Sequence, residues 1–148
     1  MLTNRSMPPA VVIPELAYED VGAAVQWLCE AFGFEERLRI ADHRAQLVLG
    51  TGAIVVTQRR SNANAGGDAT HAMMVRVEDA DAHCARVAQC GARVLQPPTD
   101  YPYGERQYTV QDPGGHVWTF SQTLADVDPA GWGGTLRQTS SGTRPQDP

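Results

Sequence analysis

The chain of 148 residues has the length of a single domain, and 42% hydrophobic residues are enough to build a packed core. A formal net charge of -5 argues against a nucleic-acid partner, because binding to phosphates needs clustered Lys and Arg. The longest apolar runs, such as residues 53–56, fall far short of the roughly 20 residues of a membrane span. The first ten residues carry neither a secretory nor an organelle signal pattern, so we expect a cytoplasmic protein with no membrane partner.

The first half of the chain is expected to form a strand, a helix and three further strands. A strand over residues 11–17 precedes a helix with Asp20 as its N-cap and Gly33 as its end. Apolar residues recur at helical spacing between these two caps and define one buried face. Strand-like runs follow at 34–40, 45–50 and 53–58. A small, polar segment at 60–69 then reads as a flexible linker.

The second half repeats this order of elements. A strand at 72–77 leads into a helix capped by Asp79 and ended by Gly91, and strands are expected at 93–95, 105–111 and 117–121. The chain is therefore predicted to be α+β, with two tandem βαβββ modules. Two helices can cover only one face of each four-stranded sheet, so the other face is left for the paired module, a partner chain or a ligand.

The clearest sequence signal for a β-hairpin lies near the end of this pattern. Tyr108 and Val110 share one face of a strand, and Asp112-Pro113-Gly114-Gly115 supplies the turn to the next strand. At these residues the chain resembles the glyoxalase/bleomycin resistance protein/dioxygenase (vicinal oxygen chelate) superfamily, in which an Asp-Pro-x-Gly turn joins the last two strands. The resemblance covers a domain at 10–122, with modules 10–60 and 70–122, and implies curved mixed sheets around a concave cleft. Residues 123–148 form an extension whose distal part, 138–148, is expected to be disordered.

The resemblance also poses the question of a metal ion. Metal-dependent members of the superfamily present His, Gln or Glu ligands from the first, fourth, fifth and eighth strands. The matching positions here are Ile13, Val56, Ala72 and Thr119, and none of these is a suitable ligand. His71 lies one residue from Ala72 and should face the other way unless a bulge intervenes, in which case it could join Glu15 in a cation site. We therefore expect no metal and no cofactor.

Side chains predicted to face the cleft form an amphipathic pocket suited to a small molecule. The predicted ligand-binding residues are Ile13, Glu15, Val56, Met74, Arg76, Tyr101, Tyr103, Gln107, Thr119 and Ser121. Tyr101 and Tyr103 belong to a segment at 96–104 with three prolines, which we expect to form an ordered lid. No nucleophile motif accompanies them, and no catalytic residue is assigned.

The first hypothesis is a metal-free, small-molecule-binding homodimer that resembles bleomycin resistance proteins and sequesters a toxic or antibiotic compound. A second is a divalent-metal-dependent lyase, isomerase or dioxygenase built on the same fold. A third is a structural or partner-binding module. The sequence leaves open whether any reaction is catalysed and whether the cleft forms within one chain or across two.

Overall fold

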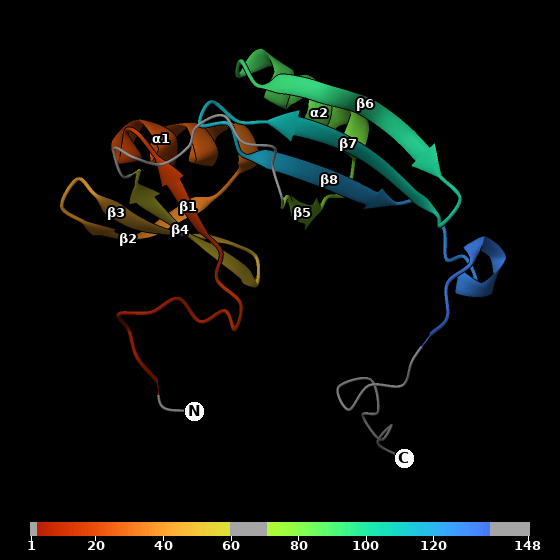
Figure 1. Cartoon of the computed structure of the whole chain (residues 1–148), viewed down its shortest axis with the longest axis horizontal. Helices are drawn as coiled ribbons and strands as arrows, with labels where there is room; N and C mark the ends of the chain where they lie inside the picture. The colour runs from red at the N-terminus through yellow and green to blue at the C-terminus, as the bar shows by residue number, and fades with distance from the viewer. Residues whose placement is uncertain (1–2, 60–70, 137–148) are drawn as a thin grey trace.

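The computed structural model of the chain describes residues 3–59 and 71–136 (Figure 1). The expected linker at 60–69 and the expected disordered tail at 138–148 lie outside the described residues. The elements are β1 (Glu15–Tyr18), α1 (Val21–Phe32), β2 (Glu35–Ile40), β3 (Arg44–Leu49), β4 (Gly52–Gln58), β5 (Met73–Arg76), α2 (Ala80–Gln89), β6 (Arg93–Tyr101), β7 (Glu105–Gln111), β8 (Val117–Thr123) and a 3₁₀ helix η1 (Pro129–Trp132).

The strands form two four-stranded mixed sheets with the same topology. Their orders are β1-β4-β3-β2 and β5-β8-β7-β6. In each sheet the strand that comes first along the chain pairs in parallel with the strand that comes last, β1 with β4 and β5 with β8. Helix α1 packs on the first sheet and α2 on the second (Figure 1), and the two helices contact each other. The predicted α+β fold with two repeated βαβββ modules is therefore confirmed. No helix of the described part is long and apolar enough to cross a bilayer.

Local capping explains where both helices begin. The Asp20 carboxylate accepts a hydrogen bond from the Ala23 amide at 3.0 Å, and Asp79 does the same for Ala82 at 3.0 Å. Gly33 ends α1 in the left-handed conformation at φ 81°, which glycine adopts without steric cost. The predicted caps at Asp20 and Asp79 are thus confirmed.

Both modules share one hydrophobic core. Phe32 at the end of α1 packs edge-on against Trp118 and Phe120 of β8, with ring centroids 4.9 Å apart in both pairs. Tyr108 and Val110 are fully buried, as their predicted common face requires. The helical layer between the sheets therefore unites the two repeats.

A buried carboxylate joins the modules a second time. Asp112 Oδ2 accepts from the Tyr18 hydroxyl at 2.6 Å and from the Trp118 indole at 3.0 Å. Its Oδ1 accepts from the backbone amides of Gly114 and His116, at 3.0 and 2.9 Å. Burial and the adjacent Asp112 carboxylate raise the pKa of Tyr18, so this hydroxyl remains a donor. The Asp-Pro-Gly-Gly turn is thus both a hairpin turn and an inter-module contact.

Two expected elements differ from the structure. The first strand begins at Glu15 rather than near residue 11, because the preceding residues form an N-terminal arm. Strand β6 continues through Pro97 and Pro98 to Tyr101, so the lid expected at 96–104 is wrong. Prolines are tolerated here because β6 is an edge strand, and its pairing with β7 is irregular between Val94 and Thr99.

Candidate functional site

The face of the second sheet that points away from the helices carries the strongest candidate site. Along β7 and β8, alternate residues such as Tyr108 and Phe120 enter the core, and the residues between them face the other side. The pairs Met74–Thr119 and Gln107–Ser121 lie in register on that opposite face. The strand period thus separates a packed face from a polar and thioether face.

A cavity of about 460 Å³ lies on this open face. It is lined by Met74, Arg76, Tyr103, Glu105, Gln107, Ser121 and Trp132. Met74 and Arg76 also border a cavity of about 650 Å³ that continues along β5 toward the turn between β3 and β4. Cavities of this size suit a small organic molecule.

A chain of hydrogen bonds fixes the polar floor of the 460 Å³ cavity. The Tyr103 hydroxyl donates to Gln107 Oε1 at 3.0 Å, Gln107 Nε2 donates to Ser121 Oγ at 3.0 Å, and Ser121 Oγ donates to Glu105 Oε1 at 2.8 Å. Desolvation, Tyr101 and Glu105 raise the pKa of Tyr103, which keeps its hydroxyl protonated. These side chains satisfy one another, so the floor is ordered before any ligand arrives.

The remaining predicted residues of the second module lie beside this cavity. Thr119 Oγ1 is 3.1 Å from Thr109 Oγ1 on the neighbouring strand. The Tyr101 ring stacks on Tyr103 with centroids 5.4 Å apart, and its hydroxyl accepts from Gln96 at 2.8 Å. Tyr101 therefore supports Tyr103 from the edge strand.

The first sheet places its predicted residues differently. Glu15 is exposed and forms an ion pair with Arg44. Val56 is fully buried in the core, and Val55 is the residue paired with Glu15 across the parallel β1–β4 ladder. The position predicted for Val56 is therefore wrong by one residue, because a shift of one along a strand moves the side chain to the other face.

Ile13 lies outside β1, in the N-terminal arm formed by residues 3–13. It is half-buried and lines a cavity of about 560 Å³ between the arm and Arg37. Arg37 donates to the Arg5 carbonyl at 2.8 Å, and Gln46 on β3 donates to the Ser6 carbonyl at 2.8 Å. The arm thus lies on the first sheet, while the corresponding face of the second sheet carries the 460 Å³ cavity.

The donors on these faces do not fit a divalent cation. Within residues 3–59 and 71–136, no three His, Cys, Asp or Glu side chains gather at one point. On the open faces, β4, β5 and β8 present Val55, Met74 and Thr119, which are not metal ligands of this kind. The Glu15 carboxylate forms an ion pair with Arg44. His71 precedes β5, which begins at Met73. The set of two His and one carboxylate typical of a catalytic metal site is not assembled from these residues.

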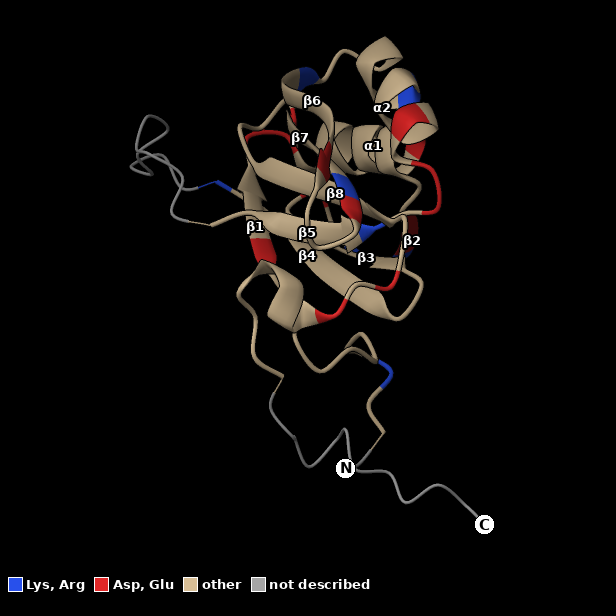
Figure 2. Cartoon of the chain, turned by 90° about the vertical axis from the view of Figure 1, so that its right-hand side faces the viewer, with Lys and Arg blue, Asp and Glu red and all other residues tan. Residues whose placement is uncertain are grey.

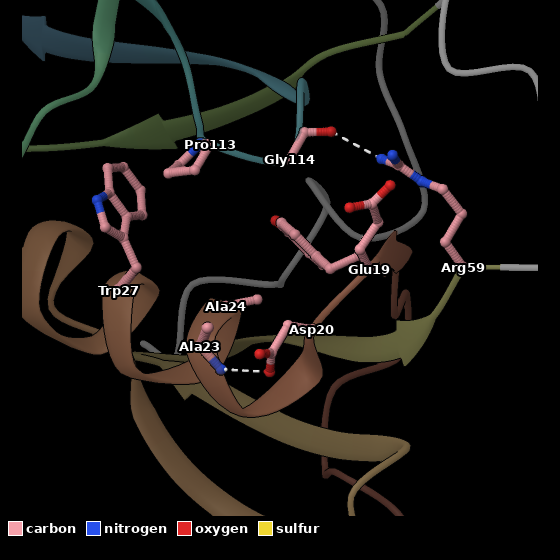
Figure 3. A pocket seen from close by; sticks show the side chains of 9 residues that line it. Glu19, Asp20, Ala23, Ala24, Trp27, Arg59, Pro113 and Gly114 are labelled. Atoms are coloured by element: carbon pink, nitrogen blue, oxygen red, sulfur yellow. Dashed lines mark hydrogen bonds between the residues drawn. The ribbon is translucent and has the colours of Figure 1, made fainter.

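Another cavity, of about 300 Å³, lies between α1 and the turn at Pro113–Gly114 (Figure 3). Two of its polar groups have structural partners: Arg59 donates to the Gly114 carbonyl at 2.8 Å (Figure 3), and the Trp27 indole donates to the Cys90 carbonyl at 2.8 Å. Asp20 in its wall caps α1. This pocket is a weaker candidate, because its Arg59 and Trp27 side chains hold the modules together.

Charged residues of the described chain are interspersed over both modules (Figure 2). Arg39, Arg44 and Arg106 each pair with a nearby carboxylate. Asp100 also lies against Arg106, whose guanidinium lowers the pKa of that carboxyl group. Arg76 instead donates to the Thr123 hydroxyl at 3.2 Å and borders the candidate cavity.

Comparison with known proteins places this architecture in a family. The chain belongs to the Glyoxalase/Bleomycin resistance protein/Dioxygenase superfamily, whose model matches residues 10–120. A search of curated proteins gave no match.

Several solved structures share the fold. TioX from Micromonospora sp. ML1 is 38% identical, with a TM-score of 0.64 over 76% of this chain and 98% of TioX. A family enzyme from Burkholderia phytofirmans PsJN is 16% identical, with a TM-score of 0.69 over 78% of this chain and 99% of that chain. The fosfomycin resistance protein FosX from Listeria monocytogenes is 14% identical, with a TM-score of 0.65 over 78% of this chain and 94% of FosX. The last two likenesses concern the fold alone.

Sequence reasoning did not include Glu105 and Trp132 among the residues of the site. Glu105 lies on the same face of β7 as Gln107, as the alternation along this strand predicts. Trp132 lies beyond the matched region, on η1, and reaches the cavity through a turn that no local pattern predicts.

Proposed function

We propose that this protein binds a small organic molecule on the open face of its second sheet, without a metal ion, and sequesters it. The observation that carries this proposal is the 460 Å³ cavity with its thioether, aromatic and amide lining. Apolar surface in such a pocket supplies affinity, and a few fixed polar groups orient the ligand. The donor set described above supports binding rather than metal-dependent catalysis. Membership of a superfamily that includes bleomycin resistance proteins makes a toxic or antibiotic compound the natural ligand class.

Two measurements on the purified protein test this proposal. Elemental analysis should find iron, zinc, nickel and manganese well below one equivalent. A thermal-shift screen of aromatic antibiotics, catechols and aldehyde–glutathione adducts should find a compound that raises the melting temperature, because a ligand that binds only the folded state stabilises it. One equivalent of metal would favour a lyase, isomerase or dioxygenase instead. Failure of every compound would favour a structural or partner-binding module.

We also propose that the protein is a homodimer whose cleft lies across two chains. The open face of the second sheet presents Met74 at 65% exposure, next to cavities that extend along the free edge of β5. A second copy could cover this surface and enclose the ligand. Sedimentation velocity at micromolar concentration should give the mass of two chains, and the mass of one chain would contradict the proposal.

We further propose that the protein acts in the cytoplasm. Fractionation of cells that express the full chain should place it with cytoplasmic markers. Recovery in a secreted fraction would contradict this location.

A further inference from the structure

The C-terminal extension contributes an exposed indole to the candidate cavity. Trp132 is 45% exposed and lines the cavity together with Tyr103. It lies beyond the residues that match the family model, which end at 120. Its position is therefore a feature of this chain's extension rather than of the two βαβββ modules.

The backbone fixes where the extension leaves the second sheet. The Leu124 and Ala125 amides donate to the Gly104 carbonyl at 2.8 and 3.4 Å. Gly104 has φ +84°, and a Cβ atom there would lie 2.5 Å from the Ala125 carbonyl oxygen and 2.9 Å from a Val127 methyl group. The turn between β6 and β7 thus has a shape that accepts the extension at close range.

The 3₁₀ helix η1 then holds the indole at the cavity. Asp128 caps η1 through the Ala130 amide at 3.1 Å, and the Gly134 amide donates to the Pro129 carbonyl at 2.8 Å. The Trp132 ring lies 5.5 Å from the Tyr103 ring at an angle of 61°. Figure 1 shows η1, in blue, beyond the end of β8.

The aromatic rings of the cavity favour a flat ligand, and Arg76 can pair with one anionic group, while the Glu105 carboxylate on the floor accepts a hydrogen bond from Ser121. The floor residues Tyr103, Gln107 and Ser121 donate hydrogen bonds to one another and to Glu105, so few of their polar groups remain for a ligand. The aromatic rings offer stacking and edge-to-face contacts. Arg76 is exposed, is the only cationic residue among those lining this cavity, and can pair with a carboxylate.

We propose that Trp132 and Tyr103 form an aromatic wall that binds a planar aromatic anion, with Arg76 holding its anionic group. This inference rests on the proposed small-molecule function and deepens it by naming the ligand class and the residue that selects it. Trp132 contacts the ring system, and the extension acts as a specificity-determining segment.

A matched pair of probes tests the ring requirement. 2-Naphthoate is planar and aromatic, whereas decahydro-2-naphthoate keeps the carboxylate on a saturated, puckered skeleton. Isothermal titration of the full chain should show 2-naphthoate binding at least about fivefold more tightly. Equal affinity for the two probes would overturn the proposal.

Substitutions then locate the site. Trp132→Ala should weaken 2-naphthoate binding about five- to tenfold, and Trp132→Phe should weaken it less. Trp27→Phe, in the other cavity, should leave the affinity unchanged. Bound 2-naphthoate should quench the fluorescence of the wild type and of Trp27→Phe, with a smaller change in Trp132→Phe. Unchanged affinity in Trp132→Ala would overturn the proposal, and far-UV circular dichroism verifies that each variant is folded.

The charge requirement has its own comparison. Arg76→Gln should weaken 2-naphthoate binding about tenfold and leave binding of neutral 2-naphthalenemethanol unchanged. Equal effects on both probes would overturn the role of Arg76. If 2-naphthoate fails to bind while another compound in the thermal-shift screen does, this inference falls and the proposed function stands. If no compound stabilises the protein, both fall.

Discussion

Gly114 occupies a position where a side chain cannot be accommodated. A Cβ atom on Gly114 would lie 2.6 Å from Cε1 of Tyr18 and closer still to Cδ1. The Tyr18 ring cannot easily move, because its hydroxyl is held by Asp112 and its centroid lies 4.7 Å from the centroid of the His116 ring. Gly114 is therefore required by the contact between the two modules.

We expect Gly114→Ala to lower the free energy of unfolding by about 1–3 kcal/mol, the usual cost of overpacking a well-filled site. Urea denaturation followed by circular dichroism measures this change. Gly131→Ala is the matched control, since a Cβ atom there meets nothing within 4 Å. An equal effect of the two substitutions would show that the Tyr18 contact is not the cause.

His83 is a second residue whose environment sets a measurable property. Its ring lies 4.2 Å from the Phe120 ring centroid and hydrogen-bonds the buried Tyr108 hydroxyl. Desolvation, with a smaller contribution from Arg86, lowers the pKa of His83 below its ordinary value of 6.5. The neutral ring is therefore the form that the folded protein favours.

This shift predicts a loss of stability in mild acid. Below pH 6.5 the unfolded chain binds a proton on His83 before the folded chain does, so stability falls as pH decreases through this range. Urea denaturation at pH 7.5 and at pH 5.5 should show a smaller pH dependence in His83→Gln than in the wild type. An unaltered slope in His83→Gln would contradict the prediction.

At the scale of elements, local signals predicted both helices and the last hairpin. Asp20 and Asp79 act through hydrogen bonds within three residues, and the Asp112 turn is also local. Such interactions can be inferred from sequence because their partners are neighbours along the chain.

Non-local pairing decided the features that the sequence did not predict correctly. Val55 faces the same side as Glu15 because β1 pairs with β4, which lies far away along the chain. No local pattern distinguishes Val55 from Val56 within an apolar run. Strand β6 extends through two prolines because β7 offers it a partner. The place of Trp132 depends on the fit between Gly104 and the extension.

The N-terminal arm is an element held by few side chains. Arg37 donates to Gln46 at 2.6 Å and to the Arg5 carbonyl at 2.8 Å, so it links β2 to β3 and to the arm. Gln46 is 5% exposed and completes the contact through the Ser6 carbonyl. The arm is thus attached through a small polar cluster.

We expect Arg37→Ala to increase the rate of trypsin cleavage after Arg5, because loss of these bonds frees the arm for proteolysis. The melting temperature should change little, since the hydrophobic core is untouched. Mass spectrometry of timed digests measures the cleavage. Arg39→Ala is the control, because Arg39 on the same strand pairs with Glu36 and not with the arm. Equal cleavage rates in the two variants would contradict the role of Arg37.

At the scale of the whole molecule, the shared core predicts a single unfolding transition. Phe32 comes from the first module, whereas its partners Trp118 and Phe120 come from the second. The Tyr18–Asp112 hydrogen bond crosses the same boundary. Neither module can unfold without exposing the core of the other, and small domains of this kind usually unfold in one step.

Phe32→Ala should therefore lower the free energy of unfolding by about 3–5 kcal/mol while the transition stays single. Tryptophan fluorescence and far-UV circular dichroism, recorded in the same urea titration, should give superimposable curves. Val87→Ala on α2 is the matched comparison, because Val87 is fully buried within the second module and should shift the same transition by a smaller amount. Separate transitions by the two probes in the wild type would show that the modules unfold independently, and the shared core would then contribute little to their cohesion.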